Sequence, residues 1–427
     1  LEDSLDTLLD LSKFEFKTHD QIVEKYKNEL TQISVIDFIY TNFKNSYNLN
    51  TFALLFGNKN ALPQIFENQT HLTLPLFYTL NGFQFLKSHE AHLKIQDDFL
   101  FYNLMMNNPL NLNAEVKKKV LNSFFTKYYQ DYSLAWQNYL TGLTISPFLT
   151  LDEAITKLNI LTNGWSPLFQ LLKQVQSNII ILSNPNFIGV NPFKDFNLWL
   201  GLSYKIPSSY RLLNDKLLQL KEYFAHISKS VNPGLLEFQQ LKVIFQNQDL
   251  QNPILSLNNF AKDLPWPLRQ WVIEIVNQSI LLLIKDSHVV VENAWKNEVI
   301  PFYHHQIKQY FPMSMNSNIY LNLNDFNSFF GKNGKIAIFY QNYLTPFLEL
   351  HQGLWQWHTF NGLNFPLSSL FLDQIQRFFL IQDFFFQFHS DEASLEFMLK
   401  PRFLDTNASM AIFSCGGQTL VYQHGPQ

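Results

Sequence analysis

The side chains best able to do chemistry are histidines and carboxylates that stand close together in the sequence. His304 and His305 are neighbours in a segment of predicted helix. Successive side chains on a helix point about 100° apart, so this pair is poorly placed to share one metal ion. Asp391 and Glu392 could act as paired carboxylates, but their position in a polar stretch favours a solvated turn.

The remaining candidates lack a partner at a useful spacing. Cys415 is the single cysteine of the sequence, which excludes an internal disulfide. It could be a nucleophile only with a nearby histidine, and His424 follows it in a short segment of predicted strand. His288 and His351 have no neighbours at metal-ligand spacing, and the sequence has neither a G-x-x-x-x-G-K-[ST] loop nor a G-x-S-x-G elbow. We therefore predict no enzymatic activity, no metal and no cofactor.

The composition favours a large aromatic core beneath a weakly charged surface. The 427 residues include 42 Phe and 18 Tyr, and 15% of them are charged, against a usual share of about 25%. The net charge is −4, and the densest basic run, Lys117–Lys119, is typical of a helix face in water. The sequence shows no basic groove with interleaved aromatics, so nucleic-acid binding is not predicted.

No apolar run reaches the ~18–20 residues of a membrane-spanning helix. The most apolar segments are Ile179–Leu182, which is short, and Ser279–Val291, which is interrupted by Lys285, Asp286 and His288. Both are therefore expected in a protein core. The sequence has no initiating Met and no signal peptide, so we expect a fragment of a longer protein.

Helices are the elements expected to position most of these residues. An aromatic stripe through Tyr128, Tyr132 and Trp136 predicts a long helix over Asn113–Leu140. Apolar periodicity predicts further helices within Leu1–Phe56, Thr150–Leu161, Tyr210–Ser230, Leu235–Gln246, Ile254–Ala261, Leu268–Trp295 and Phe365–Phe388. Prolines and glycines predict a long apolar loop over residues 183–210.

The stretch Ala294–Phe347 is predicted to form helices around an aromatic hinge. Pro312 ends the first helix, because proline has no N–H and its ring clashes with the preceding turn. Asn324 is the predicted N-cap of a short helix that carries Phe329. Gly331 is predicted to stop this short helix as its left-handed residue.

The end of the chain changes to a period of two. Leu354–Trp357 is still predicted as helix, but Leu395 and Leu399 lie in an alternating stretch that predicts a strand. Two more strands are predicted on either side of Gly416-Gly417. We therefore expect an N-terminal helical domain over residues 1–190, a C-terminal helical domain over residues 191–394, and the start of a β-domain over residues 395–427.

A family resemblance comes from patterns that occur in a fixed order. Ala294–Phe347 contains W…EV…Y…Q-Y-F-P, L-N-D-F…F-F-G-x-x-G and F-Y-x-x-Y-L-x-P-F. With Leu264–Pro267, Ile375–Phe379 and the G-Q-x-L-x-Y-x-H-G-P run from Gly417, these patterns resemble the C-terminal region of the IcmF/TssM secretion proteins. The resemblance covers residues 70–427, and it departs from the family where Gln309 stands in place of the usual arginine.

The positions that match the family's motifs are implied to be structural. They are Trp136, Pro265, Trp295, Tyr303, Tyr310, Pro312, Asp325, Phe326, Phe329, Phe330, Gly331, Gly334, Phe339, Phe347, Arg377, Phe378, Phe379, Gly417, Tyr422, His424 and Gly425.

The resemblance implies a mainly α, elongated multi-helix region with a small β-hairpin or strand element at its C-terminus. It implies a structural scaffold of an envelope-spanning bacterial secretion system, with the full-length protein anchored in the inner membrane and this region in the periplasm. The implied partners are a DotU/TssL-type inner-membrane protein, other subunits of the complex and further copies of the chain.

Two alternatives stay open at this point. The asparagine- and phenylalanine-rich composition and the missing downstream β-domain favour the type IVB (Dot/Icm) member over the type VI TssM scaffold. A secreted helical effector with enzymatic activity is the alternative from another class. Such an effector would need polar residues that converge in a cleft, which the sequence does not indicate.

Overall fold

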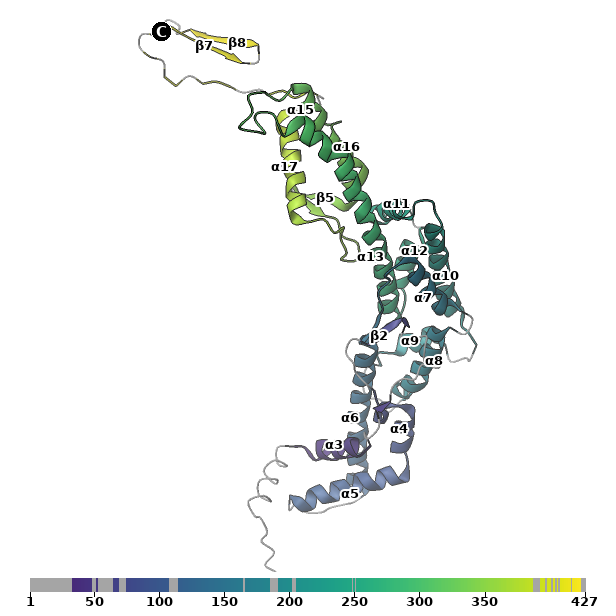
Figure 1. Cartoon of the computed structure of the whole chain (residues 1–427). Helices are drawn as coiled ribbons and strands as arrows, with labels where there is room; N and C mark the ends of the chain where they lie inside the picture. Colours follow the sequence, from purple (N-terminus) through teal and green to yellow (C-terminus); the bar gives the residue numbers. More distant parts are fainter. Residues whose placement is uncertain are drawn as a thin grey trace, which may run out of the picture. The chain divides into compact units, whose positions relative to one another are not determined.

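The computed structural model describes residues 33–47, 51–52, 64–68, 74–106, 114–163, 166–184, 191–201, 205–247, 249, 251–386, 392–395, 398–400, 402–403, 405, 408–415 and 417–423. The chain is mainly α, as predicted (Figure 1). It divides into two compact units: unit 1 is Leu1–Val290 with Thr359–Asn364, and unit 2 is Val291–His358 with Phe365–Gln427. The domain boundaries expected near residues 190 and 394 stay a prediction.

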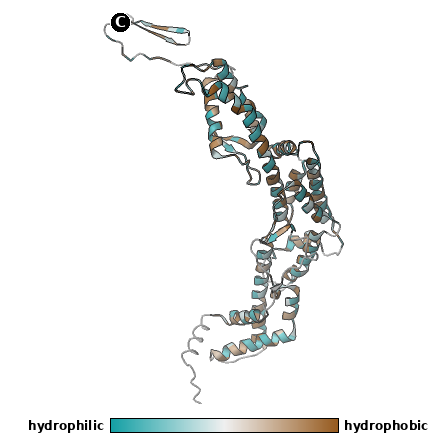
Figure 2. Cartoon of the chain, in the orientation of Figure 1, coloured by the Kyte–Doolittle hydropathy of each residue, from teal (hydrophilic) through white to brown (hydrophobic). Residues whose placement is uncertain are grey.

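Unit 1 is built mainly from helices that contain both hydrophobic and hydrophilic residues (Figure 2). They are α3 (Val35–Tyr47), α4 (Leu80–Leu86), α5 (His89–Met105), α6 (Ala114–Thr141), α7 (Leu151–Thr162), α8 (Pro167–Ile179), α9 (Lys194–Leu200), α10 (Ser208–Ser228), α11 (Pro233–Gln246), α12 (Pro253–Ala261) and most of α13 (Leu268–Ala294), with 3-10 turns η3 (Leu76–Tyr78) and η4 (Ile180–Ser183). Side-chain caps explain several starts: Thr150 accepts a hydrogen bond from the backbone N–H of Glu153, and Asn232 from that of Leu235.

The aromatic stripe of α6 forms the core of the N-terminal part of unit 1, as predicted. Tyr128, Tyr132 and Trp136 have no exposed surface. Their polar atoms are satisfied by backbone carbonyls: Trp136 Nε1 donates to Tyr78 O at 2.8 Å, and Tyr128 Oη to Phe77 O at 2.8 Å. These three large aromatic side chains are thus buried with their polar atoms hydrogen-bonded.

Two predictions for unit 1 are wrong in part. The range 183–210 is not all loop, because α9 lies within it, and both Phe196 of α9 and its N-cap Phe193 are completely buried. The range Leu1–Phe56 is not all helix, because Thr51–Phe52 (β1) pairs with Leu74–Pro75 (β3) in an antiparallel ladder. Residues 1–32, 48–50 and 53–56 of that range lie outside the described residues.

Unit 2 begins where α13 continues into helical segments that widen to π turns. These are the π turn η5 (Trp295–Val299), α14 (Ile300–Phe302) and the π turn η6 (Tyr303–Ile307). After a non-helical stretch come α15 (Leu323–Phe330), α16 (Lys335–Phe339), the π turn η7 (Tyr340–Leu344) and the 3-10 turn η8 (Thr345–Phe347). The π turns η5 and η7 each end two residues before a proline, Pro301 and Pro346. A proline has no N–H and its ring crowds the carbonyl four residues back, so a wider turn relieves the clash.

Both the start and the end of the short helix α15 differ from the prediction. Its N-cap is Asn322, not Asn324, and the Asn322 side chain accepts from the N–H of Asn324 at 2.8 Å. Gly331 is extended (φ −63°, ψ 168°) rather than left-handed. A Cβ on Gly331 would collide with the carbonyl oxygen of Asn327, so close backbone approach, not a positive φ, requires glycine there.

The strands form two-stranded antiparallel pairs wherever the structure describes them. Leu354–Trp357 is a strand (β6) paired with Leu348–His351 (β5), so its predicted helix is wrong. Trp355 and Trp357 are half-buried while Leu354 and Gln356 are exposed, which is the alternation of a half-covered strand.

The C-terminal residues form one helix and one hairpin. Helix α17 (Ser369–Phe385) lies within the predicted Phe365–Phe388. Met410–Cys415 (β7) pairs with Gln418–Gln423 (β8), as predicted. Of the strand expected from Leu395 to Leu399, the described residues 395, 398 and 399 form no strand, and residues 396–397 lie outside the described residues.

Candidate functional site

The residues that could do chemistry do not converge in the described structure. His304 and His305 are exposed on η6, and Cys415 is exposed in β7. Asp391 and His424 lie outside the described residues. Across the described part of the chain, no group of three or more His, Cys, Asp or Glu side chains is arranged to hold a metal ion.

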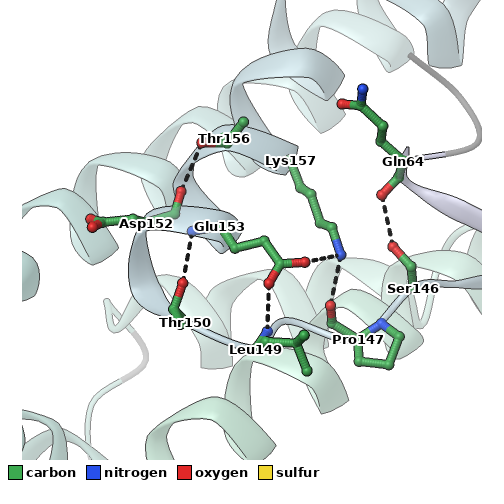
Figure 3. A network of polar contacts seen from close by, with 9 residues as sticks. All are labelled: Gln64, Ser146, Pro147, Leu149, Thr150, Asp152, Glu153, Thr156 and Lys157. Atoms are coloured by element: carbon green, nitrogen blue, oxygen red, sulfur yellow. Dashed lines mark hydrogen bonds and ion pairs between the residues drawn. The ribbon is translucent and has the colours of Figure 1, made fainter. Parts of the chain in front are cut away.

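A network of polar contacts in unit 1 surrounds residues 142–150, the connector between α6 and α7 (Figure 3). On the α7 side, the ammonium of Lys157 lies 2.6 Å from the carboxylate of Glu153 and donates to the carbonyl of Pro147 at 2.7 Å. The other oxygen of Glu153 accepts from the N–H of Leu149 at 3.3 Å. Lys157 is buried, with 8% of its surface exposed, so this ion pair fixes the connector to α7 through partly desolvated charges.

Helix α13 contacts the same connector from a distant part of the sequence. Trp271 Nε1 donates to Leu143 O at 2.9 Å, and the carboxylate of Glu274 accepts from the N–H of Ile145 at 2.8 Å. Lys285 Nζ donates to Leu149 O at 3.1 Å. The backbone groups of an otherwise half-paired strand are therefore satisfied by side chains of one long helix.

The third set of contacts to the connector comes from the segment around strand β2 (Phe66–Asn68). Strand β2 pairs with Leu143–Ile145 (β4) in an antiparallel ladder. Ser146 extends this pairing: its N–H donates to Ile65 O at 2.8 Å and its hydroxyl to Gln64 O at 2.9 Å (Figure 3). Contacts from three parts of the chain, α7, α13 and the segment around β2, therefore meet at these nine residues.

Unit 1 also holds a buried carboxyl group without a cation. Glu237 on α11 is 1% exposed, and its Oε2 has no hydrogen-bond partner. No described residue forms an ion pair with it. Burial, with the charge and hydrogen bond of Asp286 on α13, raises the pKa of Glu237 to about 8. Near neutral pH this side chain is therefore mostly protonated.

In unit 2, the predicted motif residues build a chain of contacting rings. Phe329 stacks on Phe302 with ring centroids 5.8 Å apart and meets Phe330 edge-on at 4.9 Å. Phe330 in turn stacks on Phe378 of α17 at 6.4 Å. Trp295 of the first π turn meets Phe339 at 4.9 Å. These rings join the segments of unit 2 by apolar contact, with the geometry that aromatic pairs prefer.

Polar contacts reinforce this aromatic chain. The hydroxyl of Tyr343 in η7 donates to the carboxylate of Glu298 in η5 at 2.9 Å, so the two π turns are joined directly. Gly334 lies in a tight cradle, because a Cβ there would be 2.7 Å from Phe329 O. The L-N-D-F…F-F-G-x-x-G pattern therefore forms a compact corner, in which the missing Cβ of each glycine lets a backbone carbonyl oxygen approach closely.

Other predicted motif residues are dispersed. Trp136 and Pro265 are in unit 1, Arg377 is exposed on α17, and Gly417 and Tyr422 are exposed in the hairpin. His424 and Gly425 lie outside the described residues. The structural roles implied for the motif positions stay predictions.

Sequence reasoning missed the connector contacts. Glu153 and Lys157 stand four residues apart on a helix, a spacing that indicates an ion pair and could have been found. Glu274 gave no such signal, because its partner Ile145 is 129 residues away in the sequence.

Comparisons with known proteins match most of the chain. Residues 1–179 match the family model described as IcmF-related, intracellular multiplication and human macrophage-killing. The chain is 22% identical to the type VI secretion system component TssM1 of Pseudomonas aeruginosa over an alignment 467 residues long, which covers 99% of this chain and 42% of that protein. The chain therefore spans less than half the length of this curated relative.

Solved structures share the fold. A type VI secretion system membrane core complex chain matches with a TM-score of 0.58 and 15% identity, covering 92% of this chain and 79% of that one. A type VI membrane complex chain matches with a TM-score of 0.55 and 15% identity, covering 90% and 75%. Among the described residues, none of the helices has both the length and the hydropathy needed to cross a membrane.

Proposed function

We propose that this chain, an IcmF/TssM-family protein, is a structural segment of the membrane core complex of a bacterial secretion system. The observation that carries this proposal is the alignment of 99% of the chain with TssM1. The structure is consistent with a mechanical role: the connector is fixed by buried polar contacts, and unit 2 is joined by aromatic rings. In this role the chain holds its partners in register and carries out no reaction.

The proposed system is type VI, because TssM1 and the two solved structures described above are named as type VI components. Type IVB is the second candidate. It is favoured by the asparagine- and phenylalanine-rich composition and by a family model described through intracellular multiplication. Deleting the chain's gene and assaying the substrates of each system separately would distinguish the two. Loss of type VI secretion alone supports the first candidate, and loss of type IVB secretion alone supports the second.

We further propose that this region is periplasmic and that its partners are a DotU/TssL-type inner-membrane protein, other subunits and further copies of the chain. Fractionation of cells that express the tagged full-length protein tests this location. The protein is expected in the envelope, and its region 1–427 is expected to resist protease in intact cells and to be cleaved in spheroplasts. Recovery from the culture medium would contradict the scaffold role and favour the secreted effector.

Alanine substitutions separate the scaffold from an enzyme. His304→Ala, His305→Ala and Asp391→Ala are each expected to leave secretion unchanged, because a scaffold uses no catalytic group. If one of them abolished an activity of the purified protein, the enzymatic alternative would be favoured.

A further inference from the structure

Helix α17 presents a row of exposed residues opposite to its buried face. Leu370, Leu380 and Phe384 are large apolar side chains with 67%, 62% and 54% of their surface exposed. Asp373 and Arg377 are exposed between them. At about 100° per residue, these five positions fall within roughly 80° of one another on the helix. We call this row the α17 stripe.

The face of α17 opposite the stripe is already used. Ile375 and Phe378 are buried, and Phe378 stacks with Phe330 within unit 2. The stripe has the spacing i, i+3, i+7, i+10, i+14, which is that of a helix seam rather than of a solvated face. No described residue forms an ion pair with Asp373 or Arg377, although they stand four residues apart. An apolar seam with unpaired opposite charges at its centre is the pattern of a surface made for another helix.

The order of Asp373 and Arg377 along α17 favours a second copy of this helix as the binding partner. When two copies of α17 pack antiparallel about a twofold axis level with Ile375, Asp373 of each copy faces Arg377 of the other, and Leu370 faces Leu380. A parallel pair would instead place aspartate against aspartate and arginine against arginine, which is destabilising. The stripe is therefore self-complementary in the antiparallel arrangement, as a twofold interface requires.

We propose that the α17 stripe is a self-association surface through which a second copy of this chain binds antiparallel, helix against helix. This inference rests on the proposed scaffold role, to which it adds the contact between copies. One helix from each copy provides less than the ~1,600 Å² of a standard interface, so the purified chain is expected to form a weak, concentration-dependent dimer.

Sedimentation velocity of the purified 427-residue chain over a concentration series tests the proposal. Asp373→Arg and Arg377→Asp are each expected to weaken the dimer roughly tenfold or more, because symmetry repeats each like-charge contact twice. The double variant Asp373→Arg/Arg377→Asp restores both ion pairs with exchanged partners, so dimerisation should return. Asp383→Arg, the same charge change on an exposed position of the same helix outside the stripe, should leave the dimer intact.

The proposal is overturned if the chain stays monomeric at the highest concentration, if single reversals have no effect, or if the double variant is as weak as the single ones. All the substituted side chains are exposed, and thermal melts by circular dichroism check that each variant is folded. The assay uses purified protein, so its failure would leave the envelope location untouched, and the fractionation result would not decide the dimer contact.

Discussion

Replacing Glu237 by glutamine should stabilise unit 1, and the gain should grow with pH. The pKa of Glu237 is raised from 4.5 in the unfolded chain to about 8 in the folded one. Between these values the folded state holds a proton that the unfolded state releases, so folding stability falls as pH rises through this window. At pH 7 the cost is 2.5 pH units at 1.36 kcal/mol each, or roughly 3 kcal/mol. Glutamine avoids this cost, because it is neutral at every pH and can still donate to Asp286.

The assay is urea denaturation at pH 5, 7 and 8, followed by the fluorescence of Trp271 and the other tryptophans. Glu237→Gln should exceed the wild type by less than about 1 kcal/mol at pH 5 and by roughly 3 kcal/mol at pH 7, with a further increase at pH 8. Glu222→Gln, the same change at an exposed position of α10, is the matched control and should show no pH trend. A destabilising Glu237→Gln, or a gain that is independent of pH, would refute the idea of a buried protonated carboxyl.

The remaining predictions concern packing and the connector. Phe329→Ala should lower the free energy of unfolding by roughly 3–5 kcal/mol in a chemical melt, because Phe329 is buried. Phe403→Ala, at an 84% exposed position, is the control and should cost little. A loss below about 1 kcal/mol for Phe329→Ala would show that the ring is not buried. Lys157→Met should lower the free energy of unfolding by about 2 kcal/mol or more, because it leaves Glu153 without its cation. The double variant Lys157→Met/Glu153→Gln should recover part of that loss. Equal stabilities of Lys157→Met and the double variant would argue against a coupled pair. Trp136→Phe should cost roughly 1–3 kcal/mol, because Tyr78 O loses its donor, and unchanged stability would mean that water replaces the indole N–H.

Much of the helical part could be predicted, because its signals are local and repeated. The stripe of α6 runs through many turns, so the helical period is unambiguous and the burial of Trp136 follows from it. The start of α7 was predicted, because Thr150, the first residue of the expected range Thr150–Leu161, is the N-cap of this helix.

The errors occurred where a residue type has more than one structural use. Gly331 was expected to be left-handed, but glycine is also required where a backbone carbonyl approaches closely, and the sequence alone does not separate the two uses. Leu354–Trp357 is too short for its period to distinguish a strand from a helix, and its pairing with β5 decided the outcome.

The contacts of the connector could not be predicted for another reason. They join Ile145 to Glu274 and Leu149 to Lys285, which are brought together only by the packing of α13 against the rest of unit 1. The buried state of Glu237 is also a tertiary property, because a glutamate in the second turn of a helix is usually solvated.

The most direct test of the scaffold role is to purify the envelope complex through a tag on the full-length protein and to image the particles by cryo-electron microscopy. The account predicts several copies of this chain within one particle, with the helices of each unit resolved as described here and in contact with other subunits. Recovery of the tagged protein as a free single chain, with the complex assembling and secreting normally without it, would contradict the account.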